Sequence, residues 1–484
     1  MSRDAGLDFL RGIAIFGMVL SGTISRNPDL PGWLFHAQIG PPDFVFNSAN
    51  PGITWVDLVF PFFLFAMGMA MPLSLNRLLE KRISKISILK KLFLRSLKLW
   101  FFAVMLGHLS VFHYPPEAGY WAYLLAVLAF GGFFLAFFDL KFFSPYGKWL
   151  NAAGLVLLIA LCFIRQWAFD APFSLQKNDI IILVLANMAF WGGAIWLFTR
   201  SNLIVRLGIL ALYFGLRLTQ GIEGSWNQEL WSFLPLWWLA EQIPAFGNLL
   251  TSIGLETGKT IFYHPDYLKY LMIVLPGTIA GDLVLKYKGA ITFPSLSKTM
   301  IPAVAMILLI LLNLLGLYLR WLTTNLIISL LFLIVIYQQF QRKDFSRQNM
   351  LRHLASWAIF WVLLGLVFEA WQGGIKKDSA TYSYFFLTSG LSIFVYMAFS
   401  MLHKEDNRKA WWQPFVAIGK NPMLAYVAVG YLIVPVIGAL QLLDPLDGLH
   451  EQWKWFGLIR GLFLTAIMMA LTVLSVRKKL FWKT

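Results

Sequence analysis

The residues best suited to chemistry in this sequence are ionisable groups within and between its first two apolar stretches. Asp8 and Arg11 lie near the start of the first stretch, His36 lies in the loop that follows, and Asp57 begins the second. Charged groups in membrane-spanning segments are costly to bury and usually mark functional sites. A neutral imidazole is the usual general base near neutral pH. These residue types therefore make His36 and Asp57 candidates for acid–base chemistry.

Each acidic residue also has a structural explanation. Thr54 precedes Asp57 at capping distance, and a carboxylate in the first turn of a helix is favoured by the helix dipole. Asp8 and Arg11 share one helix face, where they can pair and anchor the helix end. The functional alternatives are that Asp57 orients or charges a nearby histidine and that Arg11 meets a phosphate arriving from the cytoplasm. Both alternatives stay open from the residues alone.

Other candidate groups lie farther along the chain. His264 is in a loop just before an apolar segment, and Asn421 lies in a Gly-Lys-Asn-Pro run. The Asn421 amide can bind backbone, substrate or an oxyanion, while Pro422 equally explains the run as a helix break. The sequence has no HExxH, CxxC, P-loop, Rossmann or GxSxG pattern, and Cys162 is its one cysteine. We therefore expect no metal site, disulfide or thiolate redox chemistry within one chain.

The elements that must position these residues are membrane helices. Apolar residues make up 58% of the chain and charged residues 13%, whereas soluble domains are about one quarter charged. Apolar stretches of about 18 residues or more recur from end to end. We predict an all-α fold, a polytopic membrane helix bundle in contact with the lipid bilayer. The formal charge of +16 fits Lys and Arg in cytoplasmic loops, so we expect no nucleic-acid partner.

About fourteen transmembrane helices are predicted, and the first is expected to be retained because it is too long for a signal peptide and lacks a cleavage site. Their approximate ranges are 6–24, 54–75, 91–112, 119–138, 148–164, 179–198, 202–219, 267–286, 299–319, 324–340, 353–371, 383–402, 413–440 and 456–476.

The distribution of positive charge predicts the orientation. With a cytoplasmic N-terminus, the inner segments hold 29 of the 40 Lys and Arg residues, which is the asymmetry expected of inner loops. Both termini are therefore predicted to be cytoplasmic. His36 and the loops 220–265, 373–381 and 441–455 then face outward.

The predicted outer loop 220–265 contains four tryptophans, Trp226 among them. Tryptophan is common in the interfacial belt of any membrane protein, but aromatic rings also stack on the apolar faces of sugars. Prolines and a glycine interrupt the loop, which suggests a re-entrant or interfacial segment. No internal repeat with matched broken helices stands out, and this counts mildly against a transporter.

Several motifs in order resemble those of a known enzyme family. LDFLRGIAIFGM at 7–18 and TWVDLVFPFFLFAMG at 54–68 resemble the two opening helices of the heparan-α-glucosaminide N-acetyltransferase family and its bacterial NagX-like relatives. HPDYLKYLMIVLPGTIAGD, IKKDSATYSYFFLTSG, GKNPMLAYV and the closing RKKLFWKT resemble later segments of that family. The resemblance covers the chain except for two helix pairs near 148–198 and 299–340. It implies a ten-helix plan with two inserted pairs, forming a single transmembrane acetyltransferase domain over 1–484 with signature helices at 6–75 and C-terminal helices at 353–476.

The activity implied by the resemblance is transmembrane acetyl transfer. Acetyl-CoA would enter from the cytoplasm as co-substrate, and the amine of glucosamine or a glucosamine-terminated saccharide would be acetylated on the outer side. The resemblance also implies a bacterial inner-membrane location and a possible homodimer. The site residues that follow are His36, Asp57 and Asn421 for catalysis, Arg11, Asp8 and Lys377 for acetyl-CoA, and His264, Asp266 and Trp226 for the acceptor.

One departure from the family pattern concerns the catalytic histidine. In an ungapped comparison, the family histidine of the first outer loop falls on Asn47, and the only histidine in this loop is His36. We expect the loop to be rearranged so that His36 takes the role; the alternative is that the family mechanism is absent. A transporter or flippase for a sugar or lipid-linked saccharide, without chemistry, is the alternative function. An acyltransferase that uses another acyl-CoA is a third.

Overall fold

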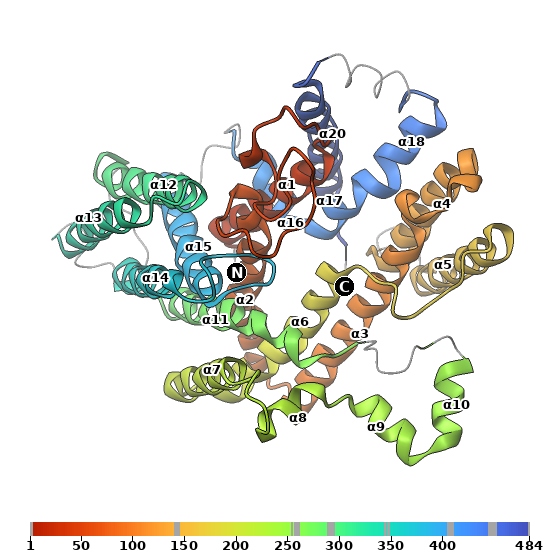
Figure 1. Ribbon diagram of the computed structural model, residues 1–484, viewed down its shortest axis with the longest axis horizontal. Coiled ribbons are helices and arrows are strands. Elements are labelled where there is room, and N and C mark those ends of the chain that lie inside the picture. Colours follow the sequence, from red (N-terminus) through yellow and green to blue (C-terminus); the bar gives the residue numbers. More distant parts are fainter. Residues whose placement is uncertain are drawn as a thin grey trace. The chain divides into compact units, whose positions relative to one another are not determined.

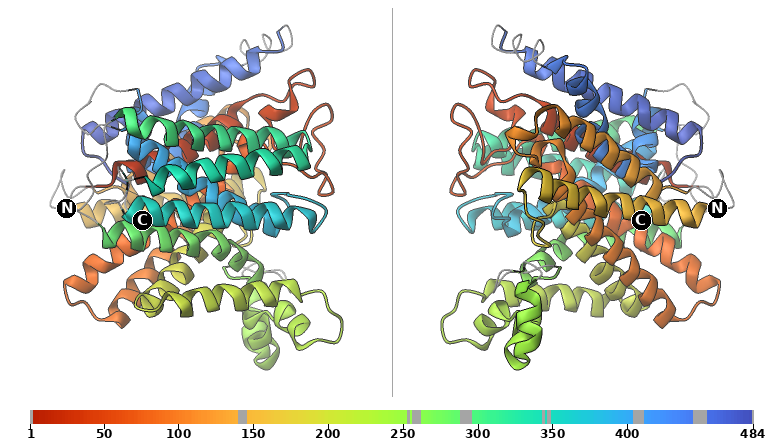
Figure 2. Two further views of the ribbon diagram at one scale, coloured as in Figure 1. Left: turned by 90° about the vertical axis from the view of Figure 1, so that its left-hand side faces the viewer. Right: turned by 90° about the vertical axis from the view of Figure 1, so that its right-hand side faces the viewer.

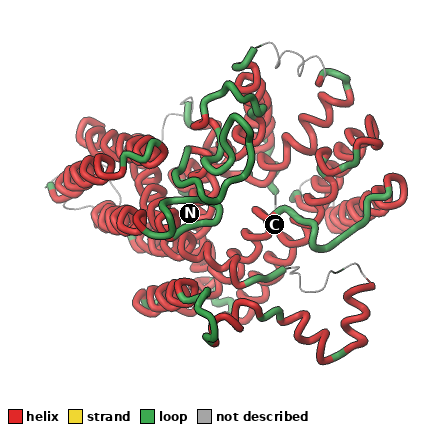
Figure 3. The backbone as a smooth tube through the Cα atoms, viewed as in Figure 1, coloured by secondary structure: helices red, strands yellow, loops and turns green. Residues whose placement is uncertain are grey.

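The computed structural model describes residues 3–139, 146–252, 255, 262–287, 296–342, 345, 349–403, 411–443 and 453–482. These residues form helices and connecting loops (Figures 1 and 3), with one isolated bridge between Phe138 and Trp482. Thirteen of the described helices are long and apolar enough to cross a membrane. The predicted class, a polytopic helical membrane protein, agrees with this architecture.

The helices are α1 (Ala5–Thr23), α2 (Trp55–Glu80), α3 (Lys85–Leu109), α4 (Gly119–Phe137), α5 (Gly147–Phe169), α6 (Ile180–Thr199), α7 (Leu203–Leu218), α8 (Trp226–Ser232), α9 (Pro235–Gln242), α10 (Pro244–Ser252), α11 (Leu271–Lys286), α12 (Leu296–Tyr318), α13 (Leu322–Gln341), α14 (Asn349–Val367), α15 (Tyr382–Leu402), α16 (Gln413–Lys420), α17 (Pro422–Ala428), α18 (Val434–Ala439) and α20 (Phe456–Arg477).

One of the fourteen predicted spans is shorter than predicted, and another is interrupted where the Gly-Lys-Asn-Pro run indicates a helix break. The segment predicted at 202–219 is α7, whose 16 residues are shorter than the roughly 20 that a transmembrane helix usually needs. The segment predicted at 413–440 is divided into α16, α17, a π-helical turn over Val429–Ile433 and α18. Proline at the start of α17 removes a backbone donor, which is why the helix is interrupted there.

The contacts group the chain into two compact units: residues 1–74, 273–429 and 444–479 in the first, and 75–272, 430–443 and 480–484 in the second. In the first unit, α1 packs against α15, α16 and α20, and α12, α13 and α14 pack in sequence beside α15. Figure 2 shows α12, α13 and α14 running alongside one another. The centre of this unit is α15, in which 89% of the residues of its most apolar 18-residue stretch are buried.

Close backbone contacts hold the first unit together where small residues allow them. A Cβ on Gly12 would overlap the Phe415 carbonyl, and one on Gly419 would overlap the Asp8 carbonyl, so α1 and α16 touch backbone to backbone. Gly277 gives α11 a similar approach to α2. Small residues are typical of such interfaces in membranes, where close packing replaces the hydrophobic effect as the driving force.

The second unit is built on the packing of α3 against α6, α4 against α5 and α18 against α4. Phe102, Phe133 and Phe137 gather around Trp482 near the end of the chain, with Phe137 stacked on the indole at 5.3 Å. The predicted outer loop 220–265 contains three short helices, α8, α9 and α10. Within that loop, residues 253–254 and 256–261 lie outside the described part of the chain.

Candidate active site

The loop between α1 and α2 is folded onto its own small core and carries His36. Ile24, Leu30, Leu34 and Phe35 are buried together, and Trp55 packs against them. The Thr54 hydroxyl donates a hydrogen bond to the Phe35 carbonyl at 2.7 Å, which fixes the backbone immediately before His36. The apolar residues of the loop, together with a short 3-10 helix over Gly32–Leu34, thus hold the imidazole in place.

A second set of hydrogen bonds ties this loop to the segment that precedes α15. The Gln38 amide donates to the carbonyls of Asn50 and Gly52 at 2.9 and 3.2 Å. The Gly52 N–H donates to the Ile375 carbonyl at 2.7 Å. Gly52 has a φ of 121°, in the region that favours glycine. These contacts bring together two loops that are more than 300 residues apart in sequence.

Asp57 is fully buried at the first turn of α2 and uses its two oxygens differently. Oδ2 accepts the Thr54 N–H at 2.9 Å and the Ala37 N–H at 3.3 Å. Oδ1 lies 3.1 Å from His36 Nδ1. Asp57 therefore makes both contacts considered from the sequence: one oxygen caps the first turn of α2, and the other faces the histidine.

Lys377 and Asp378 complete the group of charges around the imidazole. His36 Nε2 lies 2.7 Å from Asp378 Oδ2, and the Lys377 ammonium lies 4.0 Å from Asp57 Oδ1. The side-chain exposure is 0% for Asp57, 12% for His36, 23% for Lys377 and 45% for Asp378. We call His36, Asp57, Lys377 and Asp378 the His36 cluster; it runs from a buried carboxylate to an exposed one through the imidazole.

The two ring nitrogens of His36 support two proton arrangements. An ionised Asp378 requires a proton on Nε2, and Nδ1 then accepts the Gln38 backbone N–H at 3.1 Å. In that state Asp57 Oδ1 has no aligned donor among the described residues. A proton on Nδ1 instead gives Asp57 a hydrogen bond in exchange for that of Gln38, and it leaves Nε2 able to accept a proton. The cluster is therefore suited to proton transfer at Nε2.

The segment that carries Lys377 and Asp378 is held by its own polar contacts. Glu369 accepts the Ile375 N–H at 3.3 Å and pairs with Arg320 at 2.6 Å. Thr381 bonds Lys376 in both directions, receiving its N–H on the hydroxyl at 3.0 Å and donating its own N–H to the Lys376 carbonyl at 3.1 Å. Arg320 lies between α12 and α13, so this helix pair helps to position the segment.

Asp8 and Arg11 lie together at the other end of α1. Asp8 is buried and pairs with Arg3 at 2.6 Å and with Arg11 at 3.7 Å. Arg3 also donates to the carbonyls of Gly419 and Lys420, which ties α1 to the end of α16. We call Arg3, Asp8 and Arg11 the Asp8 cluster. From Asp8 to the end of α1 at Thr23 the helix rises by about 22 Å, so the Asp8 cluster and the His36 loop lie at opposite ends of α1.

Two predicted groupings differ from the arrangement in the structure. Lys377 is predicted to bind acetyl-CoA, as are Arg11 and Asp8, but its ammonium lies beside Asp57 in the His36 cluster, whereas Arg11 and Asp8 lie at the other end of α1. Asn421 was expected to act with His36 and Asp57, but it follows Lys420 at the Asp8 end of α1 and donates to the Ser475 hydroxyl at 3.2 Å. The reason for the Asn421 placement is that it joins α16 to α17, where its buried amide bridges to α20.

The three predicted acceptor residues lie in the second unit. Asp266 pairs with Arg217 and Lys269, both at 2.6 Å, and its backbone N–H donates to His264 Nδ1 at 3.1 Å. Burial lowers the pKa of His264, which favours its neutral form. Trp226 begins α8 and is 70% exposed. His264 and Asp266 are thus brought together in a charge-paired turn, and no contact joins Trp226 to them among the described contacts.

Sequence reasoning named His36 and Asp57 and missed Asp378. Its acidic type and its place in the predicted outer loop 373–381, on the same predicted side as His36, were the available signals. Asn47, at the position of the family histidine, is an exposed turn residue whose side chain accepts the Ala49 N–H at 2.9 Å. Its backbone N–H donates to the Gln38 carbonyl at 2.9 Å, so Asn47 supports the loop that His36 occupies.

Residues 3–243 match a family model described as a domain of unknown function, DUF5009. No curated protein matches the sequence. The matched range contains His36 and Asp57 and ends before Lys377 and Asp378, so it covers the buried half of the His36 cluster only.

Proposed function

We propose that the protein is a membrane acetyltransferase that moves the acetyl group of cytoplasmic acetyl-CoA to the amine of glucosamine or a glucosamine-terminated saccharide on the outer side. The observation that carries this proposal is the His36 cluster, in which a buried carboxylate, an imidazole and an exposed carboxylate stand in line. The motif resemblance to acetyltransferases of amino sugars supplies the reaction class.

In the proposed reaction, Asp378 releases its contact with His36 Nε2 and pairs with the acceptor amine, which then lies beside that nitrogen. Asp378 is the exposed member of the pair and carries a charge suited to an ammonium group. The neutral amine forms a C–N bond with the thioester carbonyl carbon, and the C–S bond breaks. The proton released from nitrogen goes to His36 Nε2, while Asp57 accepts the hydrogen bond from Nδ1 and holds the tautomer. His36 then protonates the departing CoA thiolate, and the cycle closes.

A covalent variant uses the same atoms in two steps. His36 Nε2 attacks the thioester carbonyl carbon to form an acetyl-imidazole, and the C–S bond breaks to release CoA thiolate. The amine then attacks the acetyl carbon, the bond from that carbon to Nε2 breaks, and the amine proton passes to the freed Nε2 and on to the thiolate. Lys377, whose ammonium lies beside Asp57, is the cation of the His36 cluster and would offset the negative charge that develops on the carbonyl oxygen. The two variants differ in whether CoA leaves before the amine arrives, which a product-release experiment with acetyl-CoA alone distinguishes.

On the donor side, the guanidinium groups of Arg3 and Arg11 are the groups suited to the phosphates of CoA. Arg3 is half exposed and Arg11 partly exposed, and their shared partner Asp8 is buried. Guanidinium groups bind phosphate through charge-assisted, often bidentate hydrogen bonds. The thioester would have to travel most of the length of α1 to meet His36, about 22 Å, with the nucleotide remaining near the Asp8 cluster.

Binding of acetyl-CoA to the purified full-length protein separates this proposal from a transporter that does no chemistry. A ligand that binds only the folded state at 100 times its Kd stabilises it by about 2.7 kcal/mol, so the melting temperature should rise with acetyl-CoA. When glucosamine is added together with acetyl-CoA, the protein should also form N-acetylglucosamine. Uptake of glucosamine into proteoliposomes without either result would favour the transporter. Propionyl-CoA and longer donors, tested in parallel, identify the preferred acyl group.

A further inference from the structure

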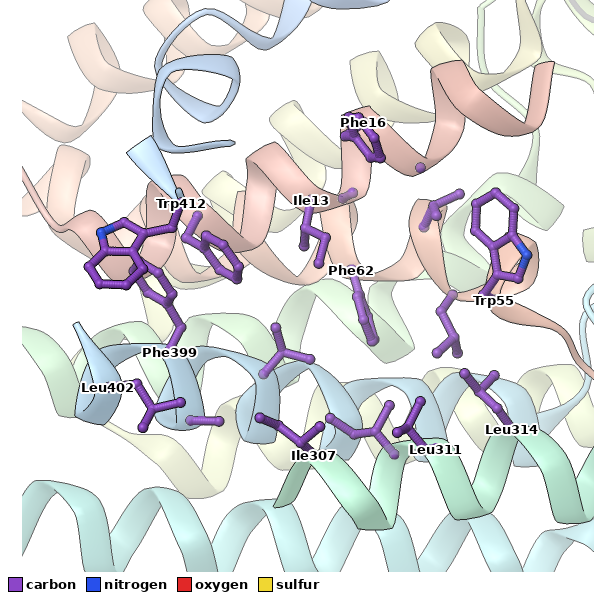
Figure 4. Close-up of a pocket in the computed structure, with 18 of the residues that line it drawn as sticks. Ile13, Phe16, Trp55, Phe62, Ile307, Leu311, Leu314, Phe399, Leu402 and Trp412 are labelled. Carbon is purple, nitrogen blue, oxygen red and sulfur yellow. The ribbon is translucent and has the colours of Figure 1, made fainter. Parts of the chain in front are cut away.

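An apolar groove with a volume of about 860 Å³ runs along the first unit. It lies between α1, α2, α12 and α15, and its walls are hydrocarbon side chains such as Ile13, Phe62 and Ile307 (Figure 4). The part of α1 that lines it, from Phe9 to Leu20, rises by about 17 Å. The groove therefore has the length and chemistry of a site for an extended hydrocarbon chain.

One end of the groove reaches the loop that carries His36. In Figure 4, Trp55 and Leu314 stand at one end and Phe399 and Trp412 at the other. Trp55 is two residues before Asp57 in the first turn of α2. Both Trp55 and Leu20 line the groove and also pack on the small core beneath His36.

The wall formed by α12 continues into the same region. One turn beyond Leu314, the backbone at Leu317 and Tyr318 contacts Gly52 in the His36 loop. The groove and the His36 cluster are thus neighbouring parts of one unit, joined by side chains and backbone that belong to both.

The residues that line the groove favour one of two possible occupants, the pantetheine arm of CoA or the hydrocarbon tail of a lipid. The pantetheine arm of CoA carries two amides, and amides buried without hydrogen-bond partners are strongly disfavoured. The walls between the two ends offer no such partners among the described lining residues. A hydrocarbon chain has no polar groups, so its burial in the groove leaves no hydrogen bond unmade. The carboxylates of the nearby His36 cluster, Asp57 and Asp378, further favour a cationic amine over an anionic head group.

We propose that the acceptor is a lipid-linked amino sugar whose hydrocarbon tail lies in this groove while its amine reaches His36. The inference rests on the proposed function, because that function defines the amine as the reacting group. It adds the class of acceptor: an amphiphile that diffuses in the membrane plane and is held by its tail.

The test uses full-length protein in phosphatidylcholine nanodiscs with acetyl-CoA and two acceptors, methyl and dodecyl β-glucosaminide. Partitioning into the bilayer alone lowers the apparent KM of the dodecyl acceptor, so chain length by itself is not decisive. A matched pair on α12 removes this effect. Leu311 lines the groove and is 55% exposed, whereas Leu308 is similarly exposed and lies outside it. Leu311→Trp fills the groove without displacing buried side chains, and Leu308→Trp adds the same bulk beside it.

We expect Leu311→Trp to raise the apparent KM for the dodecyl acceptor at least tenfold more than that for the methyl acceptor, and Leu308→Trp to leave the ratio of the two constants as in the wild type. Equal ratios in all three proteins would overturn the groove assignment, while acetylation of either acceptor would leave the proposed function in place.

A binding measurement covers the case in which neither acceptor is acetylated and the proposed function fails. Native mass spectrometry then compares retention of dodecyl β-glucosaminide with dodecyl β-glucoside, which lacks the amine. Preferential retention of the amine-bearing lipid, lost in Leu311→Trp and kept in Leu308→Trp, supports the groove. Equal retention of both lipids, or retention unaffected by Leu311→Trp, indicates ordinary lipid contact and overturns it.

Discussion

The two oxygens of Asp57 connect the local fold to the chemistry. Oδ2 receives the N–H groups of Thr54 and Ala37 and so joins the first turn of α2 to the His36 loop. Oδ1 faces the imidazole and lies 3.1 Å from His36 Nδ1. The Tyr384 hydroxyl donates to the Asp57 carbonyl at 2.7 Å and fixes the same turn from α15. A fully buried carboxylate is tolerated here because hydrogen bonds and nearby charges satisfy it.

Asp57→Asn should lower kcat with little change in KM. The amide oxygen can still accept the Thr54 N–H, so the amide NH₂ would face His36 Nδ1 and hold the ring in the tautomer with the proton on Nε2. A histidine held in that state cannot take a proton from the amine, and an equivalent change in other carboxylate–histidine pairs lowers kcat by about four orders of magnitude. Steady-state kinetics with circular dichroism as a folding control measures it; an unchanged kcat would contradict the tautomer role.

Asp378→Asn should act mainly on KM for the amine. The side chain is nearly half exposed and contacts the ring at Nε2, where the acceptor is proposed to bind. Loss of its charge removes an exposed attraction worth up to about 1 kcal/mol, so we expect KM to rise by up to about fivefold. The same assay, run at saturating acetyl-CoA, separates the two constants. A large fall in kcat with unchanged KM would instead assign Asp378 to the proton transfer.

At the residue level, the sequence analysis grouped His36 with Asp57, placed Lys377 in a different group and did not name Asp378. His36 and Asp57 were recognisable because both belong to one hairpin of two adjacent apolar runs. Lys377 and Asp378 reach the same place only through a hydrogen bond between Gly52 and Ile375, and such a long-range contact leaves no periodic signal in one sequence. Asn421 carried the right chemical group, but its amide is used at a helix junction.

At the level of elements, glycine positions in α1 determine how closely α16 can approach. Gly12 faces the Phe415 carbonyl with no room for a side chain, whereas Gly22 on the same helix has nothing within 4 Å of a Cβ. The contact between α1 and α16 also carries the hydrogen bonds from Arg3 to the end of α16. The Asp8 cluster therefore depends on this close helix pair.

Gly12→Ala should destabilise the protein, and Gly22→Ala should not. The Cβ at position 12 must push α16 away from α1, and overpacking of this kind costs about 1–3 kcal/mol or more. Alanine at position 22 meets no neighbour and gains up to about 1 kcal/mol of helix propensity. Thermal unfolding in detergent measures both, and equal melting temperatures for the two variants would contradict the backbone contact between α1 and α16.

The existence of most helices could be predicted because backbone N–H and C=O groups in hydrocarbon must form hydrogen bonds within their own segment. A long apolar run of residues therefore indicates an α-helix. Their partners could not be predicted. The pairing of α1 with α16 joins segments about 400 residues apart. The interruption at Asn421 and Pro422 was visible in the sequence as a Gly-Lys-Asn-Pro run, whereas the shortness of α7 was not, because a full span was predicted over 202–219.

At the scale of the whole molecule, the single cysteine makes the predicted membrane orientation directly measurable. Cys162 is buried in α5, and a Cys162→Ser background removes it. Asn47 and Lys81 are exposed just before and just after α2, a helix of 26 residues. If α2 spans the bilayer, the two positions lie on opposite faces.

In that background, Asn47→Cys should react with a membrane-impermeant maleimide from the outer side, and Lys81→Cys only from the cytoplasmic side in inverted vesicles. The reason is the excess of Lys and Arg in the segment from Arg77 to Lys98, which favours the cytoplasm. Labelling of both positions from the same side would contradict a spanning α2.

The central claim is that His36 transfers the proton that makes acetyl transfer possible. The measurement is the rate of N-acetylglucosamine formation from glucosamine and [¹⁴C]acetyl-CoA by the purified wild-type protein, His36→Ala and Asn47→Ala. A general base contributes about 10²–10⁴ in rate. We predict product from the wild type, a loss of at least about 100-fold in His36→Ala, and no more than a small decrease in the turn variant Asn47→Ala. Wild-type turnover by folded His36→Ala, or loss of activity in Asn47→Ala alone, would contradict the account.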